Sequence, residues 1–202
     1  MAKLLSWPAR HRRVSIAGVA LVTLGVVAVL DWPHRATAGD LRGDFAGYAT
    51  QVNGDLRSCS SEVEQTISAY NQITAGVSTQ RQTAEGIASQ TALDCTPMGN
   101  SSIDDLGTLQ PPRSLARYHL EQGSQRLYGW CASDAVDAAQ DIEGLLASPG
   151  DPALLAHLRA VLSDMQIQAA AAQQQFDTTA TSLGTAPVRF GVEAVRPGVL
   201  VG

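Results

Sequence analysis

Apolar residues recur at alternating steps of three and four along three long stretches of the chain, which is the pattern of a helix with one buried face. Before residue 186, no stretch alternates apolar and polar residues with period two, so the pattern predicts helices and no sheet. The stretches run from Leu41 to Ile73, with a weaker continuation to Thr91, from Leu120 to Leu145, and from Leu154 to Leu183.

The last two predicted helices are bounded by residues that start and stop helices. Pro111-Pro112 suits a first turn, where the missing N–H of proline would have had no partner. Ser148-Pro149-Gly150 stops the helix that follows, and Asp151 can cap the next one. Residues 113–147 and 151–183 are therefore expected to form an antiparallel hairpin with a short loop.

The positions of two cysteines indicate a turn inside the first stretch. In one unbroken helix, Cys59 and Cys95 would lie roughly 54 Å apart. A turn over residues 75–79, with Gly76 in the left-handed conformation, would place them side by side. The expected fold is therefore all-α, an antiparallel bundle of three helices without this turn and of four with it. The four helices would cover residues 40–74, 78–94, 113–147 and 151–183.

The chain has three cysteines, which are expected outside the cytoplasm, where disulfides persist. The turn favours a bond between Cys59 and Cys95. The alternative is Cys95 with Cys131, if the linker after Cys95 folds back along the next long helix. Three free thiols or an intermolecular bond are the remaining options. Cys131 lies on the apolar stripe beside Trp130, so burial as a small hydrophobic residue explains it better than reactivity.

The N-terminal segment has the charge pattern of a segment inserted into a membrane. Residues 14–30, VSIAGVALVTLGVVAVL, carry no charge and would extend roughly 25 Å as a helix, which makes them a candidate transmembrane helix or signal h-region. A basic tail over residues 1–13 precedes this run, and all 19 acidic residues follow it. The N-terminus is therefore expected in the cytoplasm and the C-terminus outside.

Two outcomes are open for residues 14–30. The length of the run, and Trp32 at the outer interface, favour an uncleaved single-pass anchor. Ala36-Thr37-Ala38 has the A-x-A form of a signal-peptidase site, so a protein secreted after cleavage at Ala38 is the alternative. The remaining chain would comprise a linker (31–39), an extracytoplasmic helical bundle (40–185) and an irregular C-terminal tail (186–202).

Charge and composition narrow the classes of function. Beyond residue 30 the chain carries ten arginines, no lysine and all 19 acidic residues. Because an excess of negative charge cannot neutralise phosphates, nucleic-acid binding is not expected. The 45% hydrophobic content provides enough apolar surface for a core, and the 5% aromatic content favours closely packed helices over a sheet.

The sequence predicts no catalytic, metal or cofactor site. The chain lacks Gly-x-Ser-x-Gly, a phosphate loop, Cys-x-x-Cys and Glu-x-x-His. In the expected hairpin, His157 would lie level with residue 142 and His119 more than about 20 Å away, so the two cannot share a metal. The best candidates for contact with a small ligand between helices are Tyr118, His119, Tyr128 and Trp130.

The stretch from Leu106 to Leu120 reads LGTLQPPRSLARYHL. It resembles a pattern of leucines around a Pro-Pro pair and a histidine in small membrane-anchored or secreted helical-bundle proteins of bacteria, mostly of unassigned function. The resemblance implies a helical bundle outside the cytoplasm, and it implies no activity.

Together these features predict a non-catalytic, membrane-anchored bundle that binds or scaffolds another protein of the cell envelope. Small side chains and glutamines on the helix faces suit packing against further helices. The alternative is a bundle that binds a small ligand and acts through a membrane partner.

Overall fold

The computed structural model describes residues 36–192, which are mostly helical and contain no strand. The described residues from Thr37 onward belong to one compact unit. The predicted all-α fold is confirmed for this part of the chain. Its elements are α2 (Ala38–Thr74), α3 (Arg81–Asp94), α4 (Ser101–Thr108), the 3-10 helix η1 (Arg113–Tyr118), α5 (Leu120–Gly129), the π-helix η2 (Trp130–Ala135), α6 (Val136–Ala147) and α7 (Pro152–Leu183).

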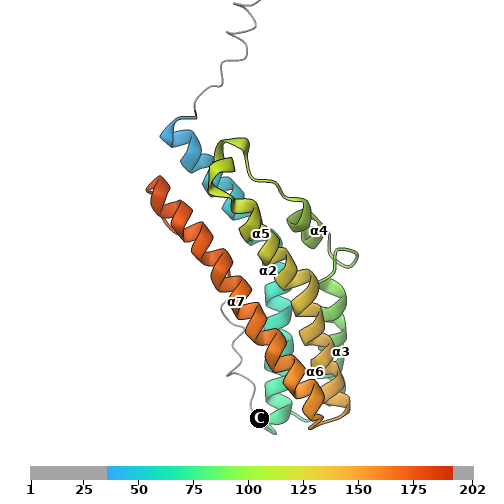
Figure 1. The fold of residues 1–202 in the computed structure, drawn as a ribbon. Coiled ribbons are helices and arrows are strands. Elements are labelled where there is room, and N and C mark those ends of the chain that lie inside the picture. Colours follow the sequence, from blue (N-terminus) through green and yellow to red (C-terminus); the bar gives the residue numbers. More distant parts are fainter. Residues whose placement is uncertain (1–35, 193–202) are drawn as a thin grey trace, which may run out of the picture. The chain divides into compact units, whose positions relative to one another are not determined.

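The long helices alternate in direction along a common axis (Figure 1). From the end at which α2 begins, called here the Ala38 end, α2 runs the whole length of the bundle and α3 returns over part of it. The path formed by α5 and α6 runs down again, and α7 returns to the Ala38 end. α3 packs on α2 and α6, whereas α7 packs on α5 and α6. The Ala38 end is therefore built from α2, α5 and α7, with η1 beside them.

A complete capping box starts α2. The Thr37 hydroxyl accepts a hydrogen bond from the Asp40 N–H at 3.2 Å, and the Asp40 carboxylate accepts one from the Thr37 N–H at 2.8 Å. The bond from the Thr37 backbone, and a second from its hydroxyl, lower the pKa of Asp40. The helix then buries one stripe, which consists of Phe45, Tyr48, Ala49, Val52, Leu56, Cys59, Val63, Thr66, Ile67 and Tyr70.

The predicted turn in the first periodic stretch is present. α2 ends at Thr74, Gly76 has φ = 69°, and α3 begins at Arg81. A positive φ favours glycine because glycine has no Cβ to clash with the neighbouring carbonyl. The reversal lets α3 pack along α2, as the cysteine spacing predicted.

Residues 113–147 do not form the single regular helix that their periodicity predicts. The segment begins as η1 and turns at His119, the one non-glycine residue of the described chain with a positive φ, 53°. α5 follows, then η2, then α6. A π turn contains more residues than an α turn, so the side chains are rotated relative to those of a regular α-helix. In η2, the buried residues are Trp130, Cys131 and Ala135.

The structure corrects the predicted disulfide, because Cys59 is bonded to Cys131 and not to Cys95. The Cα atoms of Cys59 and Cys131 lie 6.1 Å apart. Cys95 does lie level with Cys59, since its Sγ is 3.9 Å from the Cys59 carbonyl oxygen. As the residue that ends α3, however, it contacts the backbone of α2, whereas the Cys59 side chain belongs to the buried stripe that η2 contacts. Cys95 lies level with Cys59 as predicted, but the cysteine predicted to bond Cys59 was the wrong one.

Cys95 is a free, fully buried thiol. Burial raises its pKa to about 12, with further contributions from the negative charges of Glu62 and Asp94. Because the thiolate is the nucleophilic form, this environment keeps Cys95 unreactive beside the disulfide.

An aromatic cluster fills the core near the Ala38 end. Phe176 of α7 is fully buried, and its ring centroid lies 6.1 Å from those of Phe45 and Tyr48 and 4.8 Å from that of Phe190. Gly123 of α5 meets the same ring, since a Cβ added there would come within 2.9 Å of Phe176 Cε2. The absence of a side chain at Gly123 therefore allows α5 and the Phe176 ring to approach closely.

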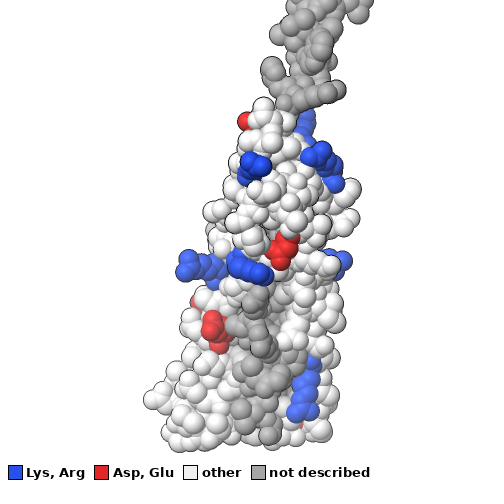
Figure 2. Space-filling model, turned by 90° about the vertical axis from the view of Figure 1, so that its left-hand side faces the viewer, with Lys and Arg blue, Asp and Glu red and all other residues white. Residues whose placement is uncertain are grey.

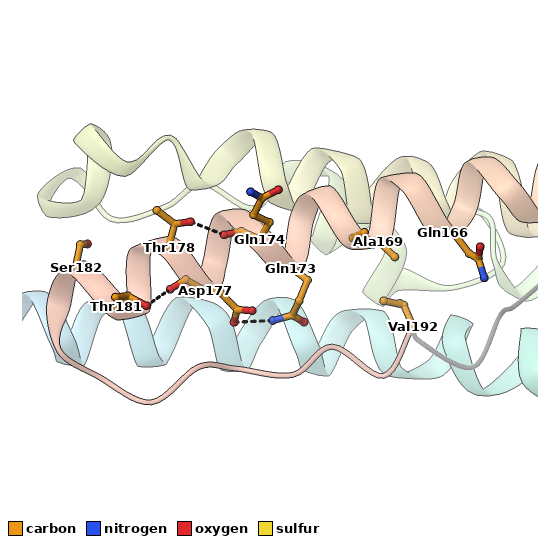
Figure 3. A pocket seen from close by; sticks show the side chains of 10 residues that line it. Gln166, Ala169, Gln173, Gln174, Asp177, Thr178, Thr181, Ser182 and Val192 are labelled. Atoms are coloured by element: carbon orange, nitrogen blue, oxygen red, sulfur yellow. Dashed lines mark hydrogen bonds between the residues drawn. The ribbon is translucent and has the colours of Figure 1, made fainter.

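Beyond Gly184, which ends α7 with φ = 63°, the chain is irregular up to residue 192 and runs back beside α7 (Figure 3). The rest of the expected tail, residues 193–202, lies outside the described residues. So do the basic tail (1–13), the candidate membrane segment (14–30) and most of the linker. In the part that the structure describes, no helix is long and apolar enough to cross a membrane.

Candidate functional site along helix α7

α7 exposes a polar face opposite its buried stripe. Amide, hydroxyl and alanine side chains alternate with the buried residues, so the helix presents hydrogen-bonding groups and little bulk. The face comprises Gln166, Ala170, Gln173, Gln174, Asp177, Thr178, Thr181 and Ser182.

A hollow runs along this face beside Val192 (Figure 3). Its volume is about 970 Å³. The Gln173 amide fixes the adjoining chain segment to α7, because its nitrogen donates to the Val188 carbonyl at 2.6 Å and its oxygen accepts from the Phe190 N–H at 3.3 Å. The same nitrogen also donates to Asp177 at 2.9 Å. We call this feature the tail-side hollow.

Two smaller hollows of about 500 and 510 Å³ lie on the other side of α7, against η1, α5 and η2. They adjoin at Gln122 and Arg126, which line both, and together they are called here the α5–α7 groove. On the α7 side, the groove is lined by Asp164, Gln168, Ala171, Gln174, Gln175, Thr178, Thr179 and Ser182, and on the other side by Arg117, Tyr118, Gln122, Gln125, Arg126, Gly129, Ser133 and Asp134.

Three residues of α7 line both the tail-side hollow and the α5–α7 groove. These are Gln174, Thr178 and Ser182, all exposed and spaced four residues apart. They form a ridge between two depressions, and helices pack by fitting such ridges into the grooves of a neighbouring helix. The spacing of four is visible in the sequence, but the hollows on either side are not.

Charged side chains are dispersed over the face drawn in Figure 2. Basic side chains are spread along its height, with acidic ones between them, so this view shows no dense patch of one sign.

The two arginines of the groove interact with neutral groups. Arg117 lies over the Tyr118 ring, 4.7 Å from its centroid, and donates to its hydroxyl at 2.5 Å. Arg126 donates to the Gln168 side-chain oxygen at 3.1 Å. Within residues 36–192, neither arginine forms an ion pair. Because a guanidinium has five N–H donors, both retain donors for another molecule.

Asp134 lies at the opposite end of the groove, half-buried in η2. Burial raises its pKa to about 6, and repulsion from Asp164 and Asp137 acts in the same direction. Asp134 and Asp164 line the same end of the groove, so this end is acidic.

The four residues predicted to contact a ligand do not share one site. Tyr118 is half-buried and lines the groove, while His119 is exposed and its carbonyl accepts a hydrogen bond from the Gln175 amide. Tyr128 lies against Gly107, on the side of α4. Trp130 is fully buried, and its Nε1 has no hydrogen-bond partner among the described residues. Of these four residues, Tyr118 is the one that lines a hollow described above.

The histidines show no metal site in the described chain. His157 Nδ1 lies 2.6 Å from Asp141 Oδ2, which matches the predicted register of the hairpin. Among residues 36–192, no three His, Cys, Asp or Glu side chains converge to hold a metal ion.

Comparison with known proteins gives no information about the function of this chain. No protein-family model, curated protein or solved structure matches the chain.

Replacing Asp134 with Asn should make the chain more stable at neutral pH. The native pKa lies above the unfolded value, so the folded state binds the proton more tightly, and stability falls as pH rises from about 4 to about 6. Asn does not ionise, so the Asp134→Asn variant should not lose this stability as the pH rises. We expect a gain of about 1 kcal/mol at pH 7.5 and almost none at pH 4, because solvent screens a half-buried group. Urea unfolding at the two pH values measures the difference.

Glu64→Gln is the matched control, because Glu64 is an exposed carboxylate on α2. Its effect on stability should be small at both pH values. A stability difference for Asp134→Asn that does not change between pH 4 and 7.5 would contradict the assignment.

Proposed function

We propose that this protein is a non-catalytic, membrane-anchored helical bundle outside the cytoplasm that binds another protein of the cell envelope through α7. The observation that carries the proposal is the ridge of Gln174, Thr178 and Ser182 with a depression on each side. A partner seated on this ridge would contact both depressions and find amide and hydroxyl groups for hydrogen bonds. Such polar contacts are normal in non-obligate interfaces.

Binding is preferred to catalysis because of the residues that line the two depressions. They are mainly amides, hydroxyls and alanines, and no lining hydroxyl hydrogen-bonds a histidine among the described residues. The contact between His157 and Asp141 lies near the loop that joins α6 to α7, away from the ridge. A nucleophile needs an adjacent base, and the depressions supply no such pair.

The start of α2 supports an uncleaved anchor. Cleavage after Ala38 would remove Thr37, whose hydroxyl and N–H both take part in the capping box with Asp40. Loss of a cap costs about 1 kcal/mol. The candidate cleavage site also overlaps the first helical residue, Ala38, so its backbone is already folded there. An intact mass of the mature chain tests this point, and a chain beginning at Gly39 would exclude the anchor.

The second candidate function is binding of a small ligand. It is favoured by the tail-side hollow, whose volume of about 970 Å³ falls in the range of small-molecule sites. Its wall includes the Gln173 and Gln174 amides, which could orient a polar ligand.

A photo-crosslinking amino acid at Thr178 tests the proposed function in intact native cells. Thr178 is exposed and lines both depressions, so we expect a protein adduct that mass spectrometry identifies. The control position is Gln82, which is exposed on α3 and should give no adduct. No adduct at Thr178, together with a thermal shift caused by a small metabolite, would favour the ligand-binding alternative.

A further inference from the structure

The α5–α7 groove has opposite charges at its two ends. On α7 it extends from Asp164 to Ser182, which corresponds to about 27 Å of one helix. Arg117 lines the part beside Ser182, and Arg126 lines the middle. Asp134 and Asp164 line the far end. The groove therefore changes from basic to acidic over about five helical turns.

These charges are not neutralised within the described chain. None of the four side chains forms an ion pair among residues 36–192. The two arginines contact Tyr118 and Gln168, and the two aspartates repel each other. Charges without an internal partner are available to a bound molecule, and they select partners through complementarity.

The shape of the groove fits a helix. Its walls are two helices packed against each other, and the side-chain ridges of a third helix can seat between them. An extended peptide could form few backbone hydrogen bonds in the groove, because the N–H and C=O groups of α7 are already hydrogen-bonded within that helix. About 18 residues of helix would span the groove.

A second copy of this chain is a poor occupant. The start of α2 lies at the basic end of the groove, since Arg42 donates to the Leu183 carbonyl at 2.8 Å. Two copies anchored by the residues before Ala38 would therefore lie parallel to each other. Facing grooves would then bring Arg117 against Arg117 and Asp164 against Asp164, and like charges disfavour this pairing.

We propose that the α5–α7 groove binds a helical segment of a different protein, which carries carboxylates where it meets Arg117 and Arg126 and lysine or arginine where it meets Asp134 and Asp164. The inference rests on the proposed function and specifies the chemistry of its partner. Its basis is the juxtaposition, along one groove, of unpaired charges of opposite sign.

Three stapled helical peptides of about 18 residues are suitable probes. They share an Ala/Gln sequence and differ in charge. One carries Glu in the first turn and Lys in the last, the second carries Lys in both turns, and the third carries Gln in both. Fluorescence anisotropy measures their binding to the full chain at low salt. We expect the peptide with opposite charges to bind about tenfold more tightly than the Gln peptide.

Arg117→Glu/Arg126→Glu makes the groove acidic along its whole length. We expect this variant to prefer the Lys peptide by about tenfold over the peptide with opposite charges. The matched control is Arg57→Glu/Arg159→Glu, which changes the net charge equally at two exposed positions outside the groove. This control should keep the wild-type preference.

Three results would overturn the inference. They are no binding of any peptide, the same switch of preference in the control variant, and a homodimer in sedimentation that Arg117→Glu/Arg126→Glu dissociates. The adduct at Thr178 reports the proposed function separately. An adduct at Thr178 without peptide selectivity therefore overturns this inference and leaves the proposed function standing.

Discussion

Removing the disulfide between Cys59 and Cys131 should lower the free energy of unfolding of the full chain by about 4 kcal/mol. The bond closes a loop with a sequence separation of 72 residues, so its removal gives the unfolded chain considerable conformational freedom. It also joins α2 to η2, two elements separated in sequence by α3, α4, η1 and α5. Urea unfolding of Cys59→Ala/Cys131→Ala, followed by circular dichroism, measures the effect.

Cys95→Ala is the matched control, because it removes a buried sulfur and leaves the bond intact. We expect a loss of about 1 kcal/mol from reduced burial alone. A tryptic digest under non-reducing conditions also identifies the bond, since the three cysteines fall in different peptides, 58–81, 82–113 and 127–159. A bond between the first two peptides, or an equal loss of stability in Cys95→Ala, would contradict the Cys59–Cys131 assignment.

Helix ends were the most predictable part of this fold, because capping is local chemistry. Asp151 accepts hydrogen bonds from the backbone of α7 as predicted, and Gly76 adopts the predicted left-handed conformation. The register of the hairpin also followed from its short loop, since His157 meets Asp141. Each of these features depends on a few neighbouring residues, which the sequence shows directly.

Rotation about a helix axis was less predictable, because it depends on packing between distant elements. The spacing of Cys59 and Cys95 indicates that they lie at the same level, but not which side chain faces which neighbour. The π turn at η2 was equally hard to predict, because the apolar periodicity tolerates one extra residue. Only the packing shows that Cys131 reaches Cys59.

The candidate site was the least predictable part. Arg117 and Asp164 lie 47 positions apart in the sequence, and they line one groove only because α7 returns beside α5. The predicted ligand contacts were chosen for their chemistry on one predicted helix. The structure divides this segment into η1, α5 and η2, and Tyr128 and Trp130 lie away from Tyr118. A spacing of four in Gln174, Thr178 and Ser182 was the available signal, and it indicates a shared face without indicating what lies beside it.

Phe176→Ala should lower the free energy of unfolding by about 3–5 kcal/mol, because it leaves a cavity at the centre of the aromatic cluster. Phe176→Leu keeps more of the side-chain volume and should cost about 1–2 kcal/mol. Urea unfolding of the full chain measures both variants. A loss below 1 kcal/mol for Phe176→Ala would show that the Phe176 ring is not packed as described.

Gly123 provides a sharper test of the same contact. In the wild-type chain, Gly123→Ala places a Cβ within 2.9 Å of the Phe176 ring, so overpacking should outweigh the helix propensity of alanine and cost about 1 kcal/mol. In the Phe176→Leu background, the ring is gone and the same substitution should gain up to about 1 kcal/mol. The double-mutant cycle should therefore show a favourable coupling of about 2 kcal/mol. Additive effects of the two substitutions would contradict direct packing of α5 on the Phe176 ring, because residues in contact couple and distant ones do not.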